Sequence, residues 1–195
     1  ATKNTPAEGN FGAGSGATVG KSRGLQFAMK GGIGTASTTL PNGLTVGAIV
    51  AVNSVGDIID PSSGAVIAGT RTADGFGLAD ARTLIREGRS SNDPQSGTNT
   101  TIGVVATNAV LTKAQVTKVG QMAHDGIALA IYPAHTTGDG DTVFSLATGT
   151  FDGKANVSTI GALAADMTVE AILRAVLAAT SIEGIPSASD INIDR

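Results

Sequence analysis

Hydrophobic residues follow two different patterns along this chain, one typical of strands and one typical of helices. Leu44–Val52 (LTVGAIVAV) is apolar at nearly every position, which is typical of a strand buried on both faces. Ile102–Thr107 (IGVVAT) and Thr142–Ala147 (TVFSLA) are shorter β-rich runs bounded by polar residues, and each predicts a strand. A turn at Asn53–Asp57 follows the first strand, and the segment Ile58–Ala68 then predicts a hairpin.

Helical spacing is clearest in the second half of the chain. Thr112 and Gln115 form a capping box, and apolar residues then recur at helical spacing until Pro133. Ser158–Thr180 contains a longer amphipathic pattern, and Leu78–Glu87 predicts a short helix that a glycine ends. Three helices are therefore expected, with strands between them.

Two segments show neither the strand pattern nor the helix pattern strongly. Phe11–Gly34 is rich in glycine and predicts short strands and turns, while Arg89–Gly97 is polar and predicts an exposed, mobile loop. That loop leads directly into the strand that follows Asn99 and Thr100. The order of strands and helices, without an internal repeat, predicts one domain over residues 1–195 of the α/β (α+β) class, with helices packed on sheet layers.

Composition narrows the possible functions. The chain has 195 residues, of which 41% are hydrophobic and 15% charged, so it can bury a core and is unlike a disordered tail. A net charge of -3 and few aromatic residues predict binding to neither nucleic acid nor an anionic membrane. The absence of cysteine excludes disulfides, thiolate metal sites and a cysteine nucleophile, and it suits a cytoplasmic protein.

The Asn99-Thr100-Thr101 sequence has three interpretations. It matches the N-x-[ST] glycosylation pattern, and Thr100 could also be an ordinary β-branched strand residue. The third interpretation is self-cleavage, in which the Thr100 hydroxyl attacks the Asn99 carbonyl. The cut would free an α-amino group on Thr100 that can act as general base for the hydroxyl of the same residue.

Other polar groups have both plain and chemical interpretations. Asp139 and Asp141 flank a glycine, as in a turn with solvated carboxylates, but with His135 they could bind a metal or orient a nucleophile. Lys21 ends a glycine-rich segment that resembles a phosphate-binding loop, yet Ser15 occupies the position of the required first glycine. Lys21 stands among small residues and could approach a reaction centre.

Several blocks, in one order, resemble the L-aminopeptidase/D-esterase (DmpA-like) peptidase family, which includes β-peptidyl aminopeptidases and nylon-oligomer hydrolases. The resemblance extends from about Phe11 to the end of the chain. The blocks are Gly16–Lys21, Met29–Thr35, Val50–Asp57, Asn99–Asn108, Leu111–Gln115, Met122–Gly126 and His135–Thr142.

The resemblance implies a layered αββα sandwich that processes itself into an α chain, here containing residues 1–99, and a β chain, residues 100–195. It places the nucleophile at Thr100, in the threonine branch of the family, with cleavage after Asn99. It further implies that Asn53 donates its side-chain amide to the oxyanion and that Lys21 tunes the new amine. Asp139 and Asp141 would orient the nucleophile.

The expected activity is hydrolysis of amide bonds in small peptides, amino-acid amides or oligoamides, without a metal or organic cofactor. The resemblance also implies a homo-oligomer of processed pairs. Family members carry an N-terminal segment before the block near Phe11, and that segment is missing here. Two alternatives remain: acyl transfer by the same nucleophile, and a non-catalytic remnant of the family.

Overall fold

A computed structural model describes residues 4–90 and 99–191. The strands are β1 (Thr18–Val19), β2 (Met29–Lys30), β3 (Gly32–Thr39), β4 (Thr45–Val52), β5 (Asp57–Ile59), β6 (Val66–Ala68), β7 (Ile102–Thr107), β8 (Ile131–Tyr132) and β9 (Thr142–Ala147). The α-helices are α1 (Ala81–Arg86), α2 (Lys113–Ala130) and α3 (Val157–Leu177), and short 3-10 turns cover η1 (Gly12–Gly14) and η2 (Leu25–Phe27).

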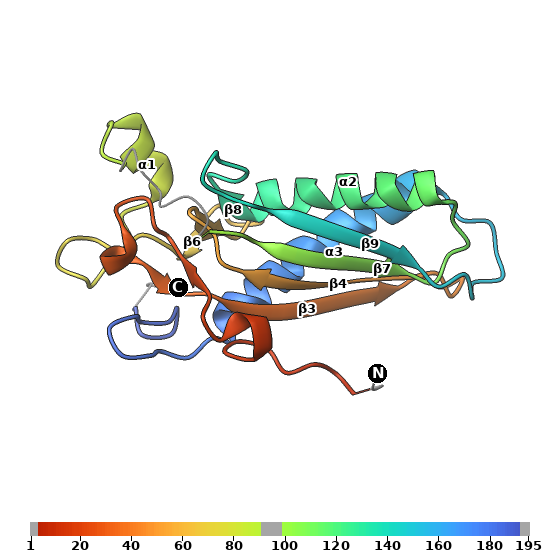
Figure 1. The fold of residues 1–195 in the computed structure, drawn as a ribbon, viewed down its shortest axis with the longest axis horizontal. Coiled ribbons are helices and arrows are strands. Elements are labelled where there is room, and N and C mark those ends of the chain that lie inside the picture. The colour runs from red at the N-terminus through yellow and green to blue at the C-terminus, as the bar shows by residue number, and fades with distance from the viewer. Residues whose placement is uncertain (1–3, 91–98, 192–195) are drawn as a thin grey trace.

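The main sheet has the strand order β3-β4-β7-β9, and α2 and α3 lie together on one of its faces (Figure 1). β3, β4 and β7 are antiparallel neighbours, whereas β7 and β9 run parallel. A parallel pair needs a crossover connection, and α2 provides it between β7 and β9. The structure is thus a sheet layer backed by a helix layer, which agrees with the mixed α/β class. None of the described helices is long and apolar enough to cross a membrane.

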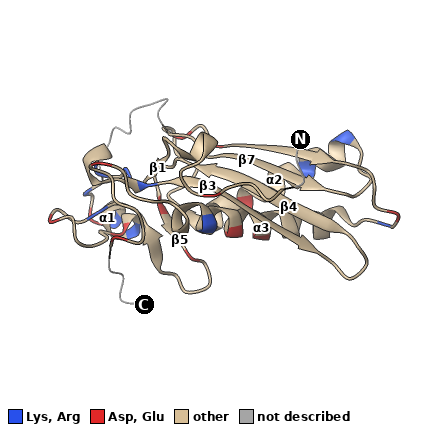
Figure 2. Cartoon of the chain, turned by 90° about the horizontal axis from the view of Figure 1, so that it is seen from below, with Lys and Arg blue, Asp and Glu red and all other residues tan. Residues whose placement is uncertain are grey.

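Alternation of side chains explains why the helices pack on only one face. Val46, Val50 and Val105 point toward α2 and α3 and are almost completely buried. Their neighbours along the strands point to the other face, where Phe144 and Leu146 are exposed. Strands β3, β4 and β7 carry no charged residue and are tan throughout in Figure 2.

The many glycines allow the helix layer to approach the sheet closely. A Cβ atom on Gly32 would lie 2.2 Å from the carbonyl oxygen of Ala175, and one on Gly34 would lie 2.1 Å from that of Ala171. Both distances are far below van der Waals contact. If either glycine were replaced by a residue with a side chain, α3 could not pack this close to β3.

The strongest local patterns gave the correct elements. β7 and β9 have the predicted ranges, β4 begins one residue later than predicted, and the hairpin is formed by β5 and β6. The capping box at the start of α2 is present, with the Thr112 hydroxyl accepting from the Gln115 amide and the Gln115 side chain accepting from Thr112. Helix α1 is shorter than predicted because it starts only after its N-cap, Asp80.

The glycine-rich region Phe11–Gly34 holds the short strands and turns that its sequence predicted, namely β1, β2, η1 and η2. The longer strand β3 was not predicted; it begins at the end of this region and pairs with β4 over eight consecutive residues. The glycines in its sequence, GIGTASTT, weaken the strand preference of its isoleucine and threonines, and pairing with β4 and packing against α3 stabilise the strand. The predicted loop Arg89–Gly97 lies mostly outside the described residues.

A buried carboxylate connects α1 to a second sheet, which has three strands in the order β6-β5-β8. Asp57 is fully buried; its Oδ1 accepts from the Thr70 amide at 2.7 Å and its Oδ2 accepts from the Ala81 amide at 2.6 Å. Desolvation raises the pKa of Asp57 from 3.8 to about 6, against the opposing effect of these hydrogen bonds. The folded state therefore binds this proton more tightly than the unfolded chain does.

We expect Asp57→Asn to remove a pH-dependent part of the stability. Because the folded pKa is raised, this contribution is complete below pH 3.8 and is lost as the pH rises through about 6. A difference of about two pKa units corresponds to roughly 3 kcal/mol. Thermal midpoints between pH 3.5 and 7 should show the decline in the wild type and in Asp60→Asn, but not in Asp57→Asn. A parallel decline in all three proteins would contradict the prediction.

Candidate active site

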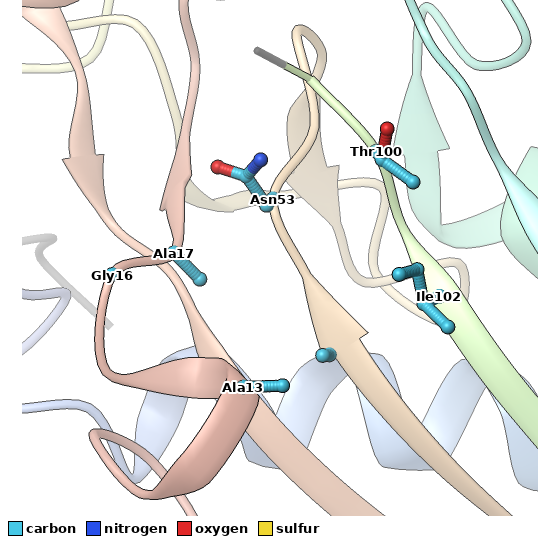
Figure 3. Close-up of a pocket in the computed structure, with 7 residues that line it drawn as sticks. Ala13, Gly16, Ala17, Asn53, Thr100 and Ile102 are labelled. Carbon is cyan, nitrogen blue, oxygen red and sulfur yellow. The ribbon is translucent and has the colours of Figure 1, made fainter. Parts of the chain in front are cut away.

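A pocket opens on the outer face of the main sheet, where β4 ends and β7 begins (Figure 3). Its volume is about 260 Å³. Asn53, the first residue after β4, and Thr100, two residues before β7, form its polar side, and their side chains lie across a gap from one another in Figure 3. The remaining lining residues are small or apolar: Ala13, Gly16, Ala17, Ala51 and Ile102.

The side-chain oxygen of Asn53 is held in place from two sides. It accepts from Lys21 Nζ at 2.8 Å and from the backbone amide of Thr18 at 3.1 Å. These two donors fix the amide plane, so that in Figure 3 the side-chain nitrogen of Asn53 lies on the side of Thr100. The amide is therefore oriented with its donor end toward the pocket.

Lys21 is a buried cation at the junction of the site. Its Nζ donates to the side-chain oxygens of Asn53 and Asn99, at 2.8 and 2.9 Å. Burial lowers the pKa of Lys21 to about 8, and the negative charge of Asp139 acts in the opposite direction. At neutral pH Lys21 is mostly protonated and places a positive charge next to the Asn99–Thr100 bond.

The Asn99–Thr100 peptide bond is surrounded by hydrogen bonds. The Thr100 hydroxyl donates to the Asn99 carbonyl oxygen at 2.5 Å, and the backbone amide of Gly140 donates to the same oxygen at 2.9 Å. The amide of Thr100 donates to the backbone carbonyl of Asn53 at 2.9 Å. The hydroxyl thus lies against the carbonyl group of the residue before it.

Asp139 and Asp141 hold backbone segments around this bond. Asp139 Oδ1 accepts from the Val55 amide at 3.1 Å, and Asp141 Oδ1 accepts from the Thr101 amide at 2.9 Å. No hydrogen bond between either carboxylate and Thr100 is among the contacts of the described residues. The structure therefore places both near the predicted nucleophile as supports of the chain on either side of it.

Two histidines extend the site away from the pocket. His135 Nδ1 lies 2.9 Å from Asp141 Oδ2, and the His124 ring lies 4.9 Å from the His135 ring. Desolvation is the largest effect that lowers the pKa of His124. Within the described residues, no group of three histidine and acidic side chains is placed to hold a metal ion.

The structure brings Lys21, Asn53 and the Asn99–Thr100 bond together, although they come from distant parts of the sequence. Sequence reasoning missed Gly140, whose amide bonds to the Asn99 carbonyl, and Thr18, whose amide orients Asn53. Both act through backbone N–H groups, which every residue except proline has. The sequence therefore offered no signal for either.

Comparison with known proteins places these features in a family context. The sequence model of peptidase family S58 matches residues 1–189. A Mycobacterium leprae protein named as an uncharacterized aminopeptidase is 44% identical, over 94% of this chain and 52% of its own length. The 6-aminohexanoate-oligomer endohydrolase of Kocuria is 29% identical, over 66% of this chain and 39% of its own length.

Solved structures of two peptidases are similar to this chain in fold. A Burkholderia beta-aminopeptidase matches with a TM-score of 0.61 and 26% identity, over 93% of this chain and 49% of that one. The L-aminopeptidase D-Ala-esterase/amidase of Ochrobactrum anthropi, described as a variant of the Ntn hydrolase fold, matches with a TM-score of 0.58 and 22% identity, over 96% and 51%. The chain spans about half the length of the mycobacterial relatives that it matches.

Proposed function

This chain belongs to peptidase family S58, and from that premise we propose that it is a self-cleaving amide hydrolase with Thr100 as N-terminal nucleophile. The observation that carries the proposal is the position of Thr100. Its hydroxyl lies against the carbonyl group of Asn99, and its side chain lines the pocket opposite Asn53. One hydroxyl can thus serve both self-cleavage and hydrolysis of a bound substrate.

Self-cleavage would proceed in two steps. Thr100 Oγ1 loses its proton and bonds to the Asn99 carbonyl carbon, the carbon–nitrogen bond breaks, and the nitrogen takes up a proton as the α-amine of Thr100. The product is an ester between Asn99 and the Thr100 hydroxyl oxygen. Water then hydrolyses the ester, leaving a carboxylate on Asn99 and a free hydroxyl on Thr100.

Hydrolysis of a substrate amide would reuse this hydroxyl. The α-amine of Thr100 takes the hydroxyl proton, Oγ1 attacks the substrate carbonyl, and the amine product leaves with a proton. The side-chain amide of Asn53 would donate to the oxyanion, a contribution of about 3–4 kcal/mol in comparable sites. Water then releases the acid from the Thr100 ester.

The surroundings suit an α-amine that acts as a base. The Thr100 nitrogen already donates to the Asn53 carbonyl at 2.9 Å, and Lys21 Nζ lies 3.4 Å from the same oxygen. After cleavage the amine and the Lys21 ammonium would be close neighbours. A nearby positive charge lowers the pKa of an amine, so more of the α-amine is unprotonated and able to accept the proton at neutral pH.

For the substrate class we propose amides of small, mainly apolar acyl groups: short peptides, amino-acid amides or oligoamides. The pocket is small, and the part of its lining away from the polar side consists of alanine, glycine and isoleucine residues. Relatives named as aminopeptidases and as a 6-aminohexanoate-oligomer endohydrolase support this range. Among the described residues, the pocket lining contains no charged side chain.

The proposal is tested by intact-mass spectrometry of the purified protein under denaturing conditions. We expect the 19.2 kDa chain to give two fragments that meet between Asn99 and Thr100. The cleaved protein should then hydrolyse alanine amides and 6-aminohexanoate oligomers, and an added amine acceptor separates hydrolysis from acyl transfer. A chain that keeps its full mass and shows no hydrolysis would contradict the proposal.

A further inference from the structure

We infer that the backbone amide of Gly140 is the oxyanion donor for self-cleavage, a role separate from that of Asn53 toward substrates. The inference rests on the proposed self-cleavage and concerns its first step. In that step the oxygen that gains negative charge is the carbonyl oxygen of Asn99. The Gly140 amide donates to this oxygen at 2.9 Å, within the range required of an oxyanion donor.

The position of this donor is set by the sheet. β7 and β9 form a parallel ladder that continues beyond their ends, through the pairing of Asn99 with Asp139. The amides of Gly140 and Thr142 donate in turn to the carbonyls of Asn99 and Thr101, both at 2.9 Å. The scissile carbonyl is therefore a member of a regular ladder, and its donor needs no rearrangement when charge develops.

The donor also stays in place when the nucleophile leaves its ground-state position. The Thr100 hydroxyl donates to the Asn99 oxygen before the reaction, but that hydrogen bond is lost once Oγ1 attacks the carbon. The Gly140 amide keeps its hydrogen bond throughout. This hydrogen bond should strengthen as the Asn99 oxygen becomes an anion. It therefore stabilises the transition state of self-cleavage more than the ground state and lowers the activation barrier.

Glycine at this position leaves room for the nucleophile. A Cβ atom on residue 140 would lie 2.7 Å from Thr100 Oγ1, closer than such contacts normally allow. The flanking carboxylates hold the segment through the amides of Val55 and Thr101. The two carboxylates of the Asp139-Gly140-Asp141 sequence thus hold the Gly140 amide in position. The absence of a side chain on Gly140 leaves space in which the Thr100 hydroxyl can move.

The experiment removes this N–H without changing the shape of the chain. Cell-free translation of the full chain with glycolic acid at position 140 replaces the amide by an ester, and glycolic acid at position 149 is the matched control. The Gly149 amide also donates one backbone hydrogen bond, to Ala109 at 3.2 Å, near the other end of β9. The rate of appearance of the two fragments is followed by intact mass.

We expect the ester at position 140 to slow self-cleavage roughly 10²- to 10³-fold, and the ester at position 149 to change it only slightly. Cleavage of the position 140 ester at the wild-type rate would overturn the inference while leaving the proposed function intact. Wild-type protein that does not cleave would instead overturn the proposed function. Circular dichroism of both esters verifies that they fold.

A second variant tests the space that glycine leaves beside the nucleophile. Gly140→Ala retains the N–H but places a methyl group against Thr100 Oγ1, so self-cleavage should slow at least tenfold. Hydroxylamine, which captures an ester once formed, should not restore the rate, because the slowed step precedes the ester. Self-cleavage of Gly140→Ala at the wild-type rate, or full restoration of that rate by hydroxylamine, would contradict this arrangement of Gly140 and the Thr100 hydroxyl.

Discussion

Thr100→Ala should remain a single chain of full mass and should hydrolyse no amide substrate. The variant lacks the hydroxyl that lies against the Asn99 carbonyl, so neither the ester of self-cleavage nor the acyl-enzyme can form. Removal of a nucleophile from an acyl-transfer enzyme costs on the order of 10⁶-fold in kcat. Intact mass and hydrolysis assays measure the two losses separately.

Thr101 provides the matched control for this variant. Its hydroxyl is buried and has no hydrogen-bond partner among the described residues, so Thr101→Val removes a neighbouring hydroxyl while keeping the shape of the side chain. Thr101→Val should cleave itself and turn over substrate at close to wild-type rates. Thr100→Ser, which keeps a hydroxyl, should also cleave. If Thr100→Ala is processed normally, Thr100 is not the nucleophile.

Asn53→Asp should lower kcat for amide hydrolysis by roughly 10²- to 10³-fold with a smaller effect on KM. The aspartate keeps an oxygen for Lys21 and for the Thr18 amide, which hold the side chain in place. It replaces the N–H group toward the pocket with a negatively charged oxygen. A developing oxyanion would then meet repulsion where the asparagine offers a donor.

Asn108→Asp tests whether such a change is harmful at any position. The Asn108 side chain likewise accepts from one backbone amide, that of Thr45 at 2.8 Å, and donates to the Gly43 carbonyl at 2.9 Å. It lies outside the pocket lining, so kcat should change less than about twofold. Steady-state kinetics of pre-cleaved proteins give both values. An Asn53→Asp protein with wild-type kcat would rule out the oxyanion role.

Local sequence patterns were sufficient for elements that carry their own signal. β7 and β9 are short β-rich runs between polar residues, and α2 begins with a capping box and continues at helical spacing. The sequence of β3 has no such pattern. Its glycines and small polar residues fit this strand because β4 and α3 contact it closely. Its strand structure is a consequence of tertiary packing.

The candidate site divides in the same way. The sequence itself determined the groups that can do chemistry: a threonine after Asn99, a lysine among small residues, and two carboxylates around Gly140. Only the tertiary structure decided that the carboxylates support backbone segments and that the Gly140 amide reaches the Asn99 carbonyl. The physical reason is that side-chain chemistry is encoded residue by residue, whereas the direction of a backbone N–H depends on how distant strands pair.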